Sequence, residues 1–254
     1  MLLAIDVGNS NVKCGLFDDN NTPLERFKIP TKQPHSVQGL YEWLCKQTDI
    51  SKITAAIYST VVPSLKAPIE GMLKKLDVPY LQLSHKLNIP ITVERRPPEK
   101  TGTDLLANAI AAHYLYPTHK VIVSFGTALT FTSVSKEGEL KGCAFVAGLG
   151  TAFRALVGDA ALLNDIELKE PPSVNGLTTE TALQSGFIFG YRGMVKEIAH
   201  RMAESFEASG DVTFITNGYE ATLVEPELPN RIFDNHITLK GLYYAACDNG
   251  LWKH

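Results

Sequence analysis

The sequence predicts an α/β protein built from two similar halves that face each other across a cleft. Short β-branched runs alternate with segments of helical periodicity, which is typical of α/β domains. A pattern of strand, turn, strand, strand and helix begins at Met1 and returns at Lys120. Because a repeat on this scale indicates a duplicated domain, we place a boundary near Pro117. The expected domains are residues 1–117 and 118–254, and the last helix is free to pack back between them.

The first half has the elements of one α/β layer. Three short strands come first, joined by turn-rich segments, and a helix, a buried strand and a second helix follow. The expected ranges are Met1–Ile5, Val12–Phe17, Leu24–Ile29, Val37–Lys46, Ile53–Thr60 and a helix that opens near Ser64. The segment "NIPITVERRPPEKTG" holds three prolines and is expected to be a surface loop. It leads into a helix over Thr103–Tyr116 with one apolar face formed by Leu106, Ala109, Ile110 and His113 or Tyr114.

The second half repeats the order of elements. A strand is expected to end in the sequence Ser-Phe-Gly-Thr-Ala, and two further strands follow it. A helix, a loop with Pro171-Pro172, a long helix, a strand, a short helix after Thr216-Asn217-Gly218 and a closing helix complete the chain. The expected ranges are Lys120–Ser124, Leu129–Val134, Leu140–Val146, Thr151–Leu163, Thr179–Ala208, Val212–Ile215 and Leu239–Asp248.

The composition argues against a nucleic-acid-binding, membrane-spanning or secreted protein. The net charge of −3 and the pI of about 6.2 give no basic excess for nucleic acid or an anionic membrane. The apolar runs are too short for a membrane span, and the acidic residues near the start are unlike a signal peptide. The four cysteines are isolated, which is typical of reduced thiols, so we expect a cytoplasmic protein.

Three glycine-bearing turns follow predicted strands: Asp6–Ser10, Ser124–Ala128 and Thr216–Gly218. Backbone N–H groups in tight turns bind phosphate oxygens, and glycine permits their close approach. Each turn alone is better explained as an ordinary β-turn. Two of them in equivalent places of a duplicated half favour a nucleotide site, and the carboxylate of Asp6 suits a hydrated Mg²⁺ ion.

A second carboxylate, Asp104, opens the middle helix after "PPEKTGT". An aspartate at a helix start is favoured by the helix dipole alone. The functional alternative is a general base that accepts the proton of an attacking hydroxyl group in phosphoryl transfer. The sequence leaves both open.

Other chemistry finds no support in the motifs. The chain has no P-loop and no G-x-G-x-x-G sequence. Its seven histidines lack metal-ligand spacing, and no serine lies in a G-x-S-x-G context.

The turns and several longer segments resemble those of type III pantothenate kinases, members of the actin-like ATPase superfamily that includes hexokinase. The resemblance covers nearly the whole chain. The segments that carry it are "AIDVGNSNVKCGLFD", "IYSTVVPSL", "GTDLLANAIAAHYLYP", "VSFGTALTFTSV", "GCAFVAGLGTAFRAL", "TTETALQSGFIFGYRGMV" and "ITLKGLYYA". It implies two tandem ribonuclease-H-like domains with a cleft between them, and ATP-dependent phosphorylation of pantothenate, the first step towards coenzyme A.

The resemblance also implies roles for individual residues. Asp104 would be the general base, and Asp6 would bind the metal ion. The ATP contacts would be Asp6, Val7, Gly8, Asn9, Ser10, Asn11, Val12, Lys13, Gly126 and Thr127. The pantothenate site would be lined by Gly102, Thr103, Asp104, Leu105 and Thr179. In relatives Thr179 is contributed across a homodimer interface, so a homodimer is implied as well.

Four positions depart from the family pattern: Leu105, Ser124, Ala147 and Asn217. Relatives have an arginine at Leu105, which would bind the pantothenate carboxylate, and leucine cannot. Arg95, Arg96 and Arg154 are candidates to replace that charge. Relatives have an aspartate at Ser124 that binds a monovalent cation, so a requirement for K⁺ or NH₄⁺ stays open. These changes keep two alternatives in view: an impaired paralogue that acts as a nucleotide-binding regulator, and a kinase of another small hydroxyl compound.

Overall fold

The computed structural model describes residues 1–33, 35–94, 97–158, 166–206, 211–224 and 227–253. The chain forms two compact units that are not contiguous in sequence. Unit 1 comprises Met1–Leu115, Glu137–Leu140 and His236–His254, and unit 2 comprises Tyr116–Lys136 and Lys141–Asn235. Each unit is a mixed α/β structure with its own sheet, as the sequence predicts. The contiguous domain limits at residue 117 remain a prediction.

Unit 1 is organised around a five-stranded sheet in the order β3-β2-β1-β4-β5. Strand β1 pairs antiparallel with β2 and parallel with β4, while β2 pairs antiparallel with β3 and β4 pairs parallel with β5. The strands are β1 (Leu2–Val7), β2 (Asn11–Phe17), β3 (Glu25–Pro30), β4 (Ala55–Thr60) and β5 (Tyr80–Gln82). Strand β1 is buried throughout, which explains why its sequence is a continuous apolar run that ends at Asp6.

Helices cover both faces of this sheet. Helices α1 (Val37–Gln47) and α2 (Pro63–Leu76) contribute Leu40, Leu44, Ile69 and Leu73 to a core with alternate residues of β1. On the opposite face Gly15 lies against Leu239 of α7 (Ile237–Asp248), the closing helix. Short 3₁₀ turns at Ile50–Lys52 and Pro98–Lys100 complete this part of the chain.

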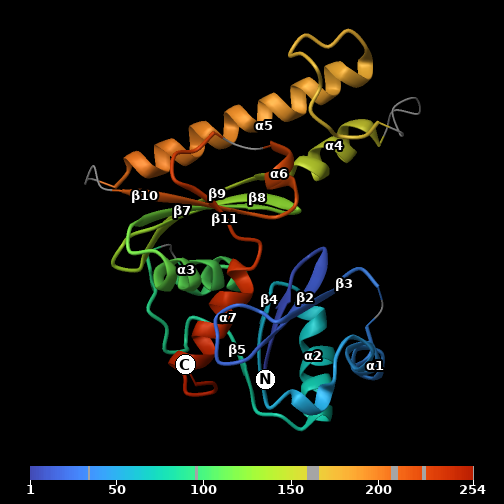
Figure 1. Ribbon diagram of the computed structural model, residues 1–254, viewed down its shortest axis with the longest axis vertical. Helices are drawn as coiled ribbons and strands as arrows, with labels where there is room; N and C mark the ends of the chain where they lie inside the picture. Colours follow the sequence, from blue (N-terminus) through green and yellow to red (C-terminus); the bar gives the residue numbers. More distant parts are fainter. Residues whose placement is uncertain (34, 95–96, 159–165, 207–210, 225–226, 254) are drawn as a thin grey trace. The chain divides into compact units, whose positions relative to one another are not determined.

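Helix α3 (Thr103–Leu115) packs along α7, and the two lie side by side in Figure 1. Leu106, Ala109 and Ile110 are buried as predicted, but burial extends to all eight residues from Leu105 to Ala112 and is not limited to one face of the helix. Small residues explain the difference, because they allow neighbouring helices to approach closely. The position of a Cβ atom on Gly241 would lie 1.8 Å from the carbonyl oxygen of Ala107.

The sheet of unit 2 repeats the strand order of unit 1. Its sequence of strands is β9-β8-β7-β10-β11, which matches β3-β2-β1-β4-β5 position by position. The strands are β7 (His119–Phe125), β8 (Ala128–Val134), β9 (Glu139–Ala147), β10 (Val212–Asn217) and β11 (Arg231–Phe233). A further two-residue strand, β6 (Thr92–Val93), pairs with Glu139 and Leu140 at the start of β9. The internal duplication predicted from the sequence is therefore present in the topology.

The helices of unit 2 pack on one face of this sheet. The long helix α5 (Thr179–Glu204) runs along this face of the sheet (Figure 1). Helices α4 (Leu149–Val157) and α6 (Glu220–Val224) both contact α5. A capping box formed by Thr178 and Thr181 fixes the start of α5. The ends predicted for the α4 and α5 helices extend into residues 159–163 and 207–208, which lie outside the described residues.

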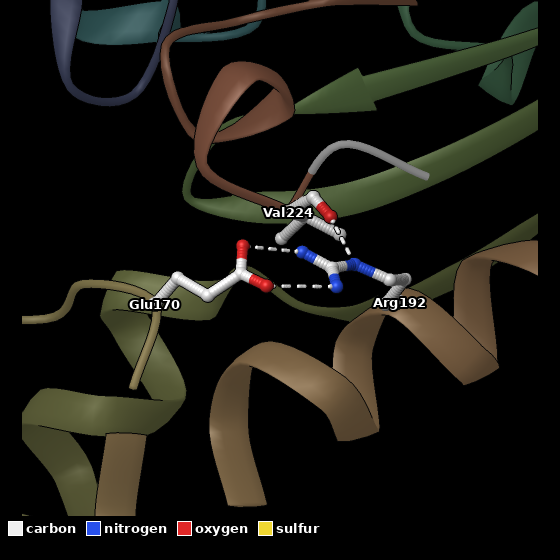
Figure 2. A network of polar contacts seen from close by, with 3 residues as sticks. All are labelled: Glu170, Arg192 and Val224. Carbon is white, nitrogen blue, oxygen red and sulfur yellow. Dashed lines mark hydrogen bonds and ion pairs between the residues drawn. The ribbon is translucent and has the colours of Figure 1, made fainter. Parts of the chain in front are cut away.

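A polar contact ties three segments of unit 2 together. Arg192 of α5 donates two hydrogen bonds to the carboxylate of Glu170, with nitrogen–oxygen distances of 3.2 and 2.9 Å. Its Nε also donates to the carbonyl oxygen of Val224, the last residue of α6, at 2.8 Å. Figure 2 shows the guanidinium group between these two partners. Arg192 therefore anchors the C-terminal end of α6 to α5.

Short edge strands escaped the sequence analysis. Strands β5, β6 and β11 have only three, two and three residues. Such segments are too short for an alternation of polar and apolar residues to identify them. The loop expected at "NIPITVERRPPEKTG" accordingly contains β6 and a 3₁₀ turn as well as irregular backbone.

Candidate active site

Three polar residues form a row across adjacent strands of unit 1. Asp6 is next to last in β1, where it pairs in register with Lys13 of β2 and with Ser59 of β4. The Ser59 hydroxyl group donates a hydrogen bond of 3.0 Å to Oδ1 of Asp6. Asp6 shares a strand face with Leu2 and Ala4, because side chains two residues apart point the same way. The row therefore ends an otherwise apolar face.

The environment of Asp6 is unusual for a carboxylate. The side chain is only 6% exposed, and burial raises its pKa to about 6. The charge of Lys13 acts in the opposite direction, the nearby carboxylate of Asp104 raises the pKa further, and the hydrogen bond from Ser59 lowers it. A charge this well buried is costly unless it has a partner. The site is therefore suited to a cation.

Asp104 lies at the start of α3 and is electrostatically coupled to Asp6 and Lys13. Burial raises its pKa, while hydrogen bonds from the backbone N–H groups of Leu105 and Asp104, and the charge of Lys13, lower it. A Cβ atom at position 102 would lie 2.5 Å from Oδ1 of Asp104, so Gly102 leaves room for the carboxylate. The neighbouring Thr103 donates from its hydroxyl group to the carbonyl oxygen of Thr60 at 3.2 Å. Both sequence interpretations of Asp104, helix start and acid–base group, are compatible with this position.

The β1–β2 turn presents an exposed tip beside this row. The Gly8 N–H group donates to the carbonyl oxygen of Asn11 at 3.0 Å, and Thr31 donates to the Gly8 carbonyl oxygen at 2.6 Å. Asn9 and Ser10 are exposed, whereas Val7 and Val12 on the flanking strands are buried. The turn is thus held at its base, with polar groups accessible at its tip.

Unit 2 has a row in the same place. Ser124, next to last in β7, pairs in register with Asn217 of β10 and with Thr130 of β8. The side-chain amide of Asn217 donates to the hydroxyl oxygen of Ser124 at 2.8 Å. The corresponding row of unit 1 carries Asp6, Lys13 and Ser59, so the charged version of the row occurs in unit 1 and a neutral version in unit 2.

Three loops of unit 2 meet around Thr127. The Gly148 N–H group donates to the carbonyl oxygen of Thr127 at 3.0 Å, and the Thr151 hydroxyl group donates to the same oxygen at 2.9 Å. The third loop includes Gly218, whose φ of +94° is disfavoured for other residues. A Cβ atom there would also lie 2.0 Å from the carbonyl oxygen of Phe125. The glycine turns at 124–128 and 216–218, singled out from the sequence, are therefore neighbours within unit 2.

The donor set fits magnesium better than a transition metal. No group of three or more His, Cys, Asp or Glu side chains suited to a metal ion occurs among the described residues. Mg²⁺ is typically held by one or two carboxylates, with waters and substrate phosphates as the other ligands. The buried carboxylate of Asp6, with Asp104 near it, meets that requirement.

The sequence pattern of type III pantothenate kinases matches residues 2–201. The chain belongs to the type III pantothenate kinase family. A member from Citrifermentans bemidjiense is 34% identical over 255 residues, covering 95% of this chain and 97% of the relative. The chain is therefore a kinase, and kinases of this family use ATP with a divalent metal ion.

Solved structures give the fold class of this pantothenate kinase family member. A Campylobacter jejuni protein named for the Baf family of transcriptional activators has a TM-score of 0.61 at 16% identity, covering 98% of this chain and all of the other. The inorganic polyphosphate/ATP-glucomannokinase of an Arthrobacter species has a TM-score of 0.51 at 15% identity, with 98% of each chain covered. At such low identity the likeness concerns the fold alone. The predicted fold class, an α/β protein with two similar domains, is confirmed.

The departures from the kinase family pattern have clear structural settings. Leu105 is 4% exposed and belongs to the buried stretch of α3. Ser124 and Asn217 are bonded to each other, and Ala147 accepts a hydrogen bond of 2.8 Å from the Tyr191 hydroxyl group. Of the candidate replacement cations, Arg95 and Arg96 lie outside the described residues, and Arg154 lies beside Glu220 in unit 2.

Two residues of these rows and loops were missed in the sequence. Ser59 follows a β-branched run, and only the register of β4 against β1 reveals that it faces Asp6. Glu220 follows the 216–218 turn, and an acidic residue in the first turn of a helix is too common to be singled out. Thr179, predicted from the resemblance, lies exposed at the start of α5.

Proposed function

We propose that this chain transfers the γ-phosphoryl group of ATP to the hydroxyl group of pantothenate, which yields 4'-phosphopantothenate and ADP at the start of coenzyme A biosynthesis. Family membership over most of the chain supports this reaction. The observation that carries the catalytic assignment is the cluster of Asp6, Lys13 and Asp104 within one compact unit. Neither alternative function is favoured by the family match.

In the proposed reaction Asp104 acts as general base. Its carboxylate accepts the proton of the pantothenate hydroxyl group as that oxygen bonds to the γ-phosphorus and the bond to the β–γ bridging oxygen breaks. A pKa raised by burial strengthens the carboxylate as a proton acceptor near neutral pH. Gly102 and Thr103 line the substrate side of this position.

The remaining groups bind ATP. We assign Asp6 to Lys13, Gly126 and Thr127 to the phosphate contacts, and Asp6 to a Mg²⁺ ion, which would neutralise phosphate charge when bound. Lys13 is exposed and close enough to affect both carboxylates, so it can also bind a phosphate oxygen. The hydrogen-bonded pair of Ser124 and Asn217 supports a reaction without K⁺ or NH₄⁺ at this position.

We further propose a homodimer formed through α4 and α5, in which Thr179 reaches the partner's pantothenate. A groove of about 380 Å³ runs between these helices, and its lining includes Leu156, Leu183, Gly186, Phe187, Gly190 and Met194. On the adjoining loop Leu177 is 94% exposed and Val174 is 64% exposed. Large apolar side chains at such exposure favour a protein interface. In a homodimer each copy would offer its groove to the exposed apolar side chains of the other copy.

The proposal places the protein in the cytoplasm, with no nucleic acid or membrane partner. The acidic balance of the chain supports this placement. No helix among the described residues has the length and apolar character needed to cross a membrane.

A coupled assay for ADP on wild type and Asp104→Asn tests the proposed reaction. Wild type should form phosphopantothenate from ATP, Mg²⁺ and pantothenate, and the variant should lose activity by about 100- to 10,000-fold while it still binds ATP. Asp77→Asn is a matched control, because Asp77 is exposed and asparagine tolerates its φ of 56°. Wild type that makes no product, or a fully active Asp104→Asn variant, would contradict the assignment.

A further inference from the structure

Glu220, the first residue of α6, places its carboxylate at the N-terminus of α4. Its Oε1 accepts a hydrogen bond of 3.0 Å from the N–H group of Gly150, and the Leu149 N–H group also bonds to the carboxylate. The N–H groups of a first helical turn have no partner within the helix. A carboxylate there satisfies two of them and complements the positive end of the helix dipole.

The second oxygen of this carboxylate is costly to bury. Oε2 of Glu220 is shielded from solvent and has no hydrogen-bond partner among the described residues. Burial raises the pKa of Glu220, whereas the two N–H groups and the charge of Arg154 lower it. A neutral cap such as serine would satisfy the helix end at a smaller desolvation cost. Helix capping alone is therefore an incomplete explanation of this carboxylate.

The residues that hold the Thr127 turn flank the two residues whose N–H groups bond to Glu220. Gly148 and Thr151, on either side of Leu149 and Gly150, both donate to the carbonyl oxygen of Thr127. The other end of α6 is anchored through Val224 to Arg192. A continuous series of contacts thus runs from α5 through α6 and Glu220 to the α4 N-terminus and then to Thr127.

We propose that Glu220 is a positioning residue for ATP: through the N-terminus of α4 it fixes the turn at Gly126 and Thr127 in the conformation that receives the nucleotide. The proposal rests on the proposed function, which assigns that turn to ATP. Glu220 acts through Gly150 and Thr127 rather than on the reacting atoms. Its loss should weaken ATP binding, and the chemical step should change little.

Calorimetry of ATP binding, with steady-state kinetics, tests this role. Glu220→Ala should raise the Kd and KM for ATP about tenfold, the range expected for loss of a charge-assisted hydrogen bond. Values of kcat and of KM for pantothenate should stay within about twofold. Glu220→Gln retains an acceptor for the Gly150 N–H group and should recover most of the affinity. Glu197→Gln is the control, because Glu197 is exposed on α5 and forms an exposed ion pair with Arg201.

A second variant reaches the same contact without changing Glu220. A Cβ atom on Gly150 would lie 2.7 Å from Oε1 of Glu220, so Gly150→Ala should displace the carboxylate and weaken ATP binding similarly. The double variant should be no worse than either single variant, since both break one contact. Additive effects, a loss confined to kcat, or unchanged ATP affinity in Glu220→Ala would overturn the proposal. Wild type that binds ATP without turnover would overturn the proposed function alone, and wild type that binds no ATP would overturn both.

Discussion

The side-chain amide of Asn217 donates a 2.8 Å hydrogen bond to the hydroxyl oxygen of Ser124, and the two residues pair in register at the ends of β10 and β7. The equivalent pair in unit 1 is Ser59 and Asp6, in which the acceptor is a carboxylate. The duplicated architecture therefore carries a negative charge at this position in unit 1 and none in unit 2.

We predict that the activity of wild type depends little on monovalent cations. Replacement of K⁺ by tetramethylammonium at constant ionic strength should change the rate by less than about twofold, because a neutral hydrogen-bonded pair lacks the charge that attracts a cation. Ser124→Asp should introduce a K⁺ dependence, measured as the rate against K⁺ concentration. A wild type that is inactive without K⁺ would refute the prediction.

Asp6→Asn should make the metal-free protein more stable at pH 8 while abolishing activity. The folded-state pKa of about 6 exceeds the value near 4 of an unfolded aspartate, so the folded state favours the protonated form. Below about pH 4 Asp6 does not reduce the unfolding free energy of the wild type. As the pH rises through 6, ionisation of the buried carboxyl group lowers the unfolding free energy by up to about 3 kcal/mol. Asparagine removes that cost and still accepts the hydrogen bond from Ser59.

Urea unfolding at pH 4 and pH 8 in the presence of a chelator measures this effect. The two proteins should differ in unfolding free energy at pH 8 and converge towards pH 4. Asp77→Asn again serves as the exposed control. If Asp6→Asn were less stable than wild type at pH 8, the buried carboxylate would be satisfied by contacts that asparagine cannot replace.

Arg192→Ala should cost more stability than Glu170→Ala. The ion pair is partly exposed, with side-chain exposures of 21% for Arg192 and 51% for Glu170, so its own contribution should stay below about 1 kcal/mol. Arg192 also donates to the Val224 carbonyl oxygen, and that loss adds about 1 kcal/mol. Thermal unfolding of both single variants and the double variant separates the two contributions. Equal losses in the single variants would show that the Val224 contact contributes nothing.

Gly190→Arg should convert the proposed dimer to a folded monomer. A Cβ atom at Gly190 meets no atom within 4 Å, so the protomer has room for the side chain, whereas a charge in an apolar interface is strongly unfavourable. Light scattering after gel filtration measures the mass, and circular dichroism checks the fold. The monomer should also have a raised KM for pantothenate if Thr179 acts on the partner. Glu204→Arg, at the exposed end of α5, should leave the dimer intact.

Local sequence patterns predicted most of the fold, because the strand, turn and helix signals of each half agree with the elements that form there. The apolar run before Asp6 and the turn at Gly8 were sufficient to predict β1 and β2. Edge strand β11 could not be predicted, because its three exposed residues carry no alternation. The full burial of α3 depends on helix packing that a single periodicity does not contain.

The sequence predicted those residues of the candidate site that have a local signal, such as a strand end or a helix start. Asp6 and Asp104 were identified by their places at a strand end and a helix start. Ser59 and Glu220 belong to the site because they bond to residues far away in sequence. Ser59 of β4 bonds to Asp6 of β1, and Glu220 bonds to Gly150 at the start of α4. Register and tertiary packing decide such pairs, and no local pattern encodes them.

Helix α7 packs on β1, β2 and β4 and covers the apolar face of this part of the sheet. Tyr243 lies 5.2 Å from Phe17 between ring centroids, and the Trp252 indole N–H group donates to the carbonyl oxygen of Asp18. During synthesis from the N-terminus, the sheet of unit 1 therefore has an exposed apolar face until residues 237–248 have left the ribosome. The described residues of unit 2 end at Asn235, so a chain stopped before residue 236 should expose its N-terminal part to proteases while its later part is still protected.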